Sequence, residues 1–176
     1  MNIVCETERL ILREFDLSDA GEFYALNNDP EVMRYTADRV FATIEESAAL
    51  IRNYKEYDKT GYGRWTVVLK ETNEVLGWCG LKYIESVQEV DLGYRLHRRY
   101  WNKGYATEAS KAALAIGFEH YGLSLIVGRT MTDNLPSRRV LEKIGMDYWK
   151  EFDFEEHPGV YYRMFKENYR NGTIRN

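Results

Sequence analysis

The strongest constraint on the fold is a strand, a short loop and a long helix that follow one another between residues 89 and 118. In "EVDLGYRL", residues 89–96, apolar residues alternate with polar or small ones, which predicts a strand with two different faces. Gly93 inside this strand indicates a bulge or a close main-chain approach. The loop "HRRYWNK" follows, and Gly104 opens an alanine-rich helix that can pack closely on a sheet. This order predicts that the helix after Gly104 begins close to the end of the strand over residues 89–96.

The loop before this helix is suited to leaving main-chain N–H groups free. Gly104 and Ala106 are small enough for a pyrophosphate to approach, and Asn102 tolerates unusual main-chain angles. The first N–H groups of a helix have no partner inside it, so they can hold an anion. A glycine that only turns the loop into the helix is the alternative. Neither GxxxxGK[ST] nor GxGxxG occurs, so neither a P-loop nor a dinucleotide fingerprint is supported.

The other predicted elements alternate between strands and helices. Strands are expected at residues 8–15, 64–70, 75–84, 125–132, 146–156 and 160–169, the last two joined through "HPG". Helices are expected from Asp16 to about Asn27, over residues 43–57 with Thr43 and Glu46 as a capping box, and after Asn134 until Gly145. The pattern predicts a mixed α/β sheet of about six or seven strands, with about four helices covering both faces.

Size and charge exclude several classes of protein. The 176 residues fit a single domain over residues 1–176, and the formal charge of -4 lacks the basic excess of a nucleic-acid binder. Cys5 and Cys79 form no paired metal motif, and the three histidines are scattered, so no metal is expected. We find no signal peptide and no run of about 20 apolar residues, which predicts a cytoplasmic protein without a membrane segment.

The stretch "WNKGYATEA" resembles the acetyl-CoA loop of the GNAT N-acetyltransferases, in particular the branch similar to the RimJ/RimL ribosomal-protein acetyltransferases. The resemblance covers nearly the whole chain: "TERLILREFDLSDA", "VLGWCGL" and "NLPSRRVLEKIGM" resemble the opening strand, the central hairpin and the AsnxxSer helix of that branch. Trp101 stands at the first loop position, as is common in this branch. Arg98 replaces a common proline, and Asn102 a common glycine.

This resemblance implies the GNAT fold, a sheet splayed between its fourth and fifth strands, with acetyl-CoA as co-substrate in the gap. Leu96 and its neighbours, Tyr94 among them, would offer main-chain hydrogen bonds to the pantetheine arm. The pyrophosphate would lie against the loop and the helix start, formed by Trp101, Asn102, Lys103, Gly104, Tyr105, Ala106 and Thr107. Asn134 is expected near the pantetheine arm or the amine channel, and a plain helix cap is its alternative role.

The resemblance also implies two catalytic residues. Asp91 matches the acidic position on the family's strand, where glutamate is more usual, and would accept the proton of the amine directly or through water; the shorter aspartate favours water. Its alternatives are orientation of a cationic substrate or exposure to solvent, and Glu89 would replace it only if the register slipped by two residues. Ser137 matches the serine that contacts the departing thiolate, with helix capping as its alternative. Tyrosine is the usual proton donor in other branches, but none of Tyr100, Tyr105 and Tyr148 is assigned that role.

The predicted function is transfer of the acetyl group of acetyl-CoA to a primary amine, through direct attack in a ternary complex. The acceptor is open: a protein N-terminus, an amino acid, a polyamine or an aminoglycoside. A non-catalytic acyl-CoA sensor and a transferase of a longer acyl group are the alternatives. Neither nucleic acid nor a membrane is an expected partner, and the resemblance leaves a homodimer open.

Overall fold

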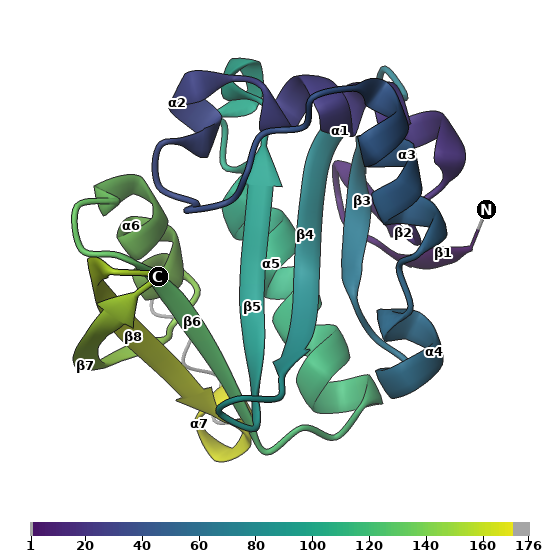
Figure 1. Cartoon of the computed structure of the whole chain (residues 1–176). Helices are drawn as coiled ribbons and strands as arrows, with labels where there is room; N and C mark the ends of the chain where they lie inside the picture. The colour runs from purple at the N-terminus through teal and green to yellow at the C-terminus, as the bar shows by residue number, and fades with distance from the viewer. Residues whose placement is uncertain (1, 171–176) are drawn as a thin grey trace.

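The computed structural model describes residues 2–170, and its centre is one mixed β-sheet (Figure 1). The eight strands of these residues lie in the order β1-β2-β3-β4-β5-β6-β8-β7. All neighbours are antiparallel except β5 and β6, which are parallel. The strands are β1 (Ile3–Glu6), β2 (Leu10–Arg13), β3 (Arg64–Leu69), β4 (Val75–Ile84), β5 (Glu89–Leu96), β6 (Leu125–Met131), β7 (Asp147–Phe154) and β8 (His157–Phe165).

The sheet opens between β5 and β6, the predicted fourth and fifth strands. Only Asp91 with Val127 and Leu92 with Gly128 are paired there, whereas β4 and β5 are paired along eight positions. Beyond Leu92 the strands diverge, and Figure 1 shows β6 running away from β5. The predicted splay is therefore confirmed. The extra strand is β1, which the prediction of six or seven strands missed because four residues are too few for a clear pattern.

Helices cover both faces of the sheet, as predicted. On one face α1 (Ala20–Asn27) and α3 (Ile44–Arg52) share a small apolar cluster beside Trp78. On the other, α5 (Tyr105–Ala115) passes behind β4 and β5 in Figure 1, and buries Ala109 and Ala113 in the main core. α6 (Leu135–Lys143) packs beside α5, while α2 (Pro30–Met33), α4 (Glu56–Thr60) and α7 (Lys166–Arg170) are single turns, so residues 2–170 contain seven α-helices where about four were expected.

The predicted helix over residues 43–57 is shorter than expected. It ends at Arg52, and the Tyr54 N–H then bonds to the Ile51 carbonyl at 3.2 Å, while the Tyr54 hydroxyl accepts a hydrogen bond from the Arg64 N–H at 2.6 Å. Thr43 caps the helix as predicted, but the Glu46 carboxylate accepts from the N–H of Ala42, not from that of Thr43. The reciprocal capping box was thus wrong in its second half.

The caps of α6 are confirmed, and the last turn is corrected. The Asn134 side chain accepts from the Ser137 N–H at 3.2 Å, and Gly145, with φ +89°, follows the helix end. The turn between β7 and β8 consists of Glu155 and Glu156, both with positive φ, so "HPG" belongs to β8. Two non-glycine residues in the left-handed region give no clear sequence signal.

Candidate active site

The loop between β5 and α5 presents a row of free main-chain donors. Asn102 has φ +58° and Gly104 has φ +81°, so the chain turns twice through the left-handed region before the helix. None of the six N–H groups of residues 102–107 has a hydrogen-bond partner at normal geometry within residues 2–170. The next N–H, that of Glu108, bonds to the Gly104 carbonyl at 3.0 Å. Several free N–H groups at a helix start are an arrangement that can bind an anion.

Thr7 and Arg9 of the N-terminal hairpin bind Glu108 and so fix the start of α5; we call these contacts the brace, and the sequence analysis missed them. The Glu108 carboxylate accepts from Thr7 at 2.5 Å, from the Arg9 N–H at 2.9 Å and from Arg9 Nε at 2.7 Å. Arg9 also donates to the Lys103 carbonyl at 3.0 Å and stacks on the Tyr105 ring. Burial raises the pKa of Glu108, but these hydrogen bonds outweigh it and lower that pKa overall. The donors Thr7 and Arg9 stand in the "TERL" stretch, but nothing in that stretch shows that Glu108 is their acceptor.

The end of β5 is partly closed by side chains. The Leu96 carbonyl accepts from the Trp101 indole Nε1 at 2.8 Å, so Trp101 lies along the strand end that was expected to meet a ligand. Tyr94 lies nearer the opening, and burial raises its pKa to about 12, against a hydrogen bond with Ser137 that lowers it. Ser137, in the first turn of α6, therefore lies near Tyr94.

Asp91 is buried, with 7 % of its surface exposed, and binds two guanidinium groups. Oδ2 accepts from Arg64 Nη2 at 2.6 Å, and Oδ1 accepts from Arg129 Nε at 3.3 Å. Arg64 also donates to the carbonyls of Gly80 and Asp91. Its guanidinium crosses Gly93 so closely that a Cβ there would lie 2.6 Å from Nη2. Gly93 thus marks a close approach, although of a side chain, and β5 has no bulge there.

The two predicted catalytic residues lie on opposite faces of the sheet. Asp91 and Tyr94 are three positions apart on β5, so their side chains point to opposite faces, and Ser137 lies with Tyr94. Of the unassigned tyrosines, Tyr148 is exposed and packs on Tyr162, and Tyr100 pairs with Tyr105 at 6.3 Å beside the loop. Glu89 accepts from the Tyr161 hydroxyl.

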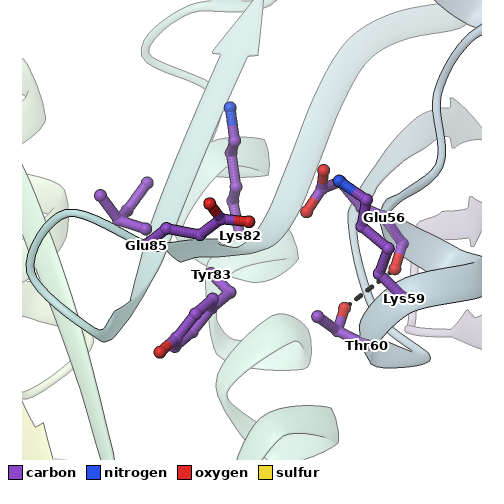
Figure 2. A pocket seen from close by; sticks show the side chains of 7 residues that line it. Glu56, Lys59, Thr60, Lys82, Tyr83 and Glu85 are labelled. Carbon is purple, nitrogen blue, oxygen red and sulfur yellow. Dashed lines mark hydrogen bonds between the residues drawn. The ribbon is translucent and has the colours of Figure 1, made fainter.

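A cavity of about 310 Å³ lies on the Asp91 side of the sheet, away from the α5 helix start. Figure 2 shows α4 residues on one side of it and the end of β4 on the other, and its wall is formed by Glu56, Lys59, Thr60, Lys82, Tyr83, Ile84 and Glu85. Lys82 is the ladder partner of Asp91, so their side chains share one face.

In residues 2–170 no group of three or more His, Cys, Asp or Glu side chains could hold a metal ion. Over the same residues, no helix has both the length and the apolar character needed to cross a membrane.

Comparison with known proteins places this geometry in a family. Residues 9–147 match the family described as the acetyltransferase (GNAT) domain. The Bacillus licheniformis protein named uncharacterized N-acetyltransferase p20 is 32% identical over 140 residues, covering 78% of this chain and 79% of its own length. The FsC-acetyl coenzyme A-N(2)-transacetylase of Aspergillus fumigatus is 29% identical over 139 residues, covering 72% of this chain and 57% of its own length.

Solved structures agree with the sequence relatives. An acetyltransferase of the GNAT family from Bacillus anthracis superposes with a TM-score of 0.81 at 29% identity, covering 95% of this chain and 99% of that one. The resemblance seen in the loop, the hairpin and the AsnxxSer helix is therefore confirmed over most of the chain. This chain belongs to the GNAT acetyltransferase family, and it is an acyltransferase of the RimJ/RimL-like kind.

Proposed function

We propose that the protein transfers the acetyl group of acetyl-CoA to a primary amine, by direct attack within a ternary complex. The observation that carries this proposal is the row of six N–H groups in residues 102–107 that have no partner within residues 2–170, next to a β5 strand that lacks a β6 partner beyond Leu92. Unpaired donors cost free energy unless water or a ligand binds them, and a diphosphate supplies several acceptors at once.

The residues around the opening fit such a coenzyme. The donors of Asn102, Lys103, Gly104, Tyr105, Ala106 and Thr107 would hold the pyrophosphate, and the side of β5 that faces away from β4 would hold the pantetheine arm next to Tyr94 and Leu96. Trp101 and Asn134 would border that arm. The bound coenzyme supplies an acyl thioester, which an amine can attack without a covalent enzyme intermediate.

Asp91 is our candidate for proton acceptor, through a water molecule. Each carboxylate oxygen accepts one guanidinium hydrogen bond and keeps a further lone pair. An ammonium group has no free lone pair, so it must lose its proton before it attacks. With a pKa near 10, only about one amine in a thousand is neutral at pH 7, and a proton acceptor is therefore needed. Main-chain N–H groups of residues 93–95 would stabilise the negative charge that develops during the attack.

Ser137 and Tyr94 form our candidate pair for the leaving group. They meet on the face opposite Asp91, and the raised pKa of Tyr94, about 12, keeps its hydroxyl protonated at neutral pH. Tyr94 can therefore donate a proton, with Ser137 orienting it. The sequence analysis named Ser137 as the partner of the departing thiolate and Tyr94 only as a neighbour of the pantetheine arm.

A thiol-release assay with acetyl-CoA and a panel of amines tests the proposal. The panel includes amino acids, polyamines, aminoglycosides and peptides with free N-termini, and calorimetry measures acetyl-CoA binding in parallel. We expect binding of the coenzyme and thiol release with at least one acceptor class. Binding without any thiol release would favour a sensor, and faster release from propionyl- or succinyl-CoA would favour a longer acyl group.

A further inference from the structure

The Asp91 cluster contains more guanidinium donors than its own acceptors use. Arg64 is held by the sheet through three hydrogen bonds: Nη1 donates to the carbonyls of Gly80 and Asp91, and Nη2 donates to the Asp91 carboxylate. Its side chain is only 12% exposed. Arg64 therefore acts as a fixed support for Asp91.

Arg129 is placed differently. It is the first residue of β6 after the last β5–β6 pair, so it stands at the start of the opening. Its Nε donates to Asp91 at 3.3 Å, while its guanidinium lies 6.0 Å from the Tyr161 ring. Within residues 2–170, neither Nη atom of Arg129 has an acceptor, so four N–H groups are left. With 21% of its side chain exposed, Arg129 is sheltered but still accessible to solvent.

Among the described residues, no neighbouring carboxylate accepts from the Nη groups of Arg129. The Glu89 carboxylate is bonded to the Tyr161 hydroxyl, and among the described residues only Asp91 lies within ion-pair distance of Arg129. Arg95, also on this face, is held by Asn27 and Asp38. The opening thus combines one carboxylate with a guanidinium group that lacks a second anion.

We propose that Arg129 determines acceptor specificity by binding a carboxylate carried by the acceptor close to its amine. This inference rests on the proposed function, and it names the acceptor class as a small zwitterionic amine, such as an amino acid. The ammonium group would face Asp91, and the carboxylate would face the Nη donors of Arg129, which suit a two-pronged carboxylate contact. Polyamines and aminoglycosides would instead place additional cations against Arg129.

Matched acceptors test this assignment. For several side chains, we compare an amino acid, its carboxamide and the corresponding decarboxylated amine, with kcat/KM from thiol release expressed per concentration of unprotonated amine. Calorimetry measures binding of the same compounds to the protein. The amino acid should exceed both analogues by about tenfold or more, the scale of one hydrogen bond between charged groups.

Variants then assign the preference to one residue. Arg129→Gln should abolish it, and Arg129→Lys should restore only part of it, because an ammonium lacks the planar fork. Arg163→Gln is the matched control: Arg163 lies on β8 against Trp149 and Phe165 and has no ion pair with Asp91. It should keep the preference. Thermal unfolding confirms that each variant is folded.

Two results would overturn the inference: equal efficiency with all three compounds, or a preference that survives Arg129→Gln. Failure of the proposed function looks different, since acetyl-CoA would then neither bind nor release thiol with any amine. In that case, the calorimetric comparison of amino acid with carboxamide still decides whether Arg129 binds a carboxylate.

Discussion

The two sides of the β5–β6 opening differ in the groups that they present: main-chain N–H groups on the α5 side and side chains on the Asp91 side. The α5 side offers main-chain N–H groups from six consecutive residues, and side-chain identity matters there mainly at Gly104. The Asp91 side is built from side chains of three strands, since Arg64 and Arg129 are 27 and 38 residues away from Asp91. A local main-chain site suits the part of the substrate that a whole family shares. A site of dispersed side chains can change its specificity residue by residue.

The largest effect should come from Asp91. Asp91→Asn should lower kcat by about a hundredfold or more at neutral pH, because the proton acceptor is lost, while acetyl-CoA affinity stays nearly unchanged. The rate should recover as pH rises toward the pKa of the acceptor amine, since free amine then accumulates. A pH–rate series beside calorimetric titration checks both points. Asp91→Glu controls for the loss of a buried ion pair, and a wild-type pH profile in Asp91→Asn would exclude the base role.

In the loop of residues 102–107, a substitution should lower the affinity for acetyl-CoA, whereas Asp91→Asn lowers kcat. Gly104→Val should weaken acetyl-CoA binding by about tenfold or more, because a β-branched residue at φ +81° costs over 1 kcal/mol and displaces the donors. Its Cβ would also lie 3.3 Å from Arg9 Nη2. Gly21→Ala is the control, since a Cβ at Gly21 meets no atom within 4 Å. Unchanged affinity in Gly104→Val, measured by calorimetry, would remove the loop from the site.

A smaller effect is expected on the face opposite Asp91. Tyr94→Phe should slow thiol release by about tenfold, and Ser137→Ala by less, because water can replace part of a hydrogen bond. Since the pKa of Tyr94 is about 12, its titration should leave no step in the rate between pH 6 and 10. Stopped-flow detection of thiol measures the rates, and full activity in Tyr94→Phe would reduce the pair to a packing role.

The smallest effect concerns the brace. The lowered pKa of Glu108 means that the ionised carboxylate stabilises the fold at neutral pH, and that this contribution is lost as pH falls through the lowered value. Glu108→Gln should therefore reduce the free energy of unfolding by about 1 to 2 kcal/mol at pH 7, and the difference should shrink below the ordinary glutamate pKa of 4.5. Urea unfolding at several pH values measures it. A difference that grows in acid would contradict the assignment.

The sequence predicted the local main-chain features of the opening, but not the contacts between side chains that are distant in the sequence. Gly104, the caps of α6 and the strand before the loop are encoded by neighbouring residues, and their positions were confirmed. The Arg64–Asp91–Arg129 cluster depends on strand pairing, and the Arg9–Glu108 contact joins residues 99 positions apart. A single sequence contains no local pattern for such contacts. The sequence placed Asp91 on a strand, but could not show that two arginines bind it.

The contact between Trp101 and the Leu96 carbonyl gives the protein a built-in optical probe. Trp101 is 40% exposed and adjoins the row of free donors, whereas Trp65 is buried in the core. A ligand seated on those donors would exclude solvent from the indole ring and shift its fluorescence. Because Trp101→Phe removes this signal without touching the main chain, coenzyme titrations can be followed in solution with no added dye.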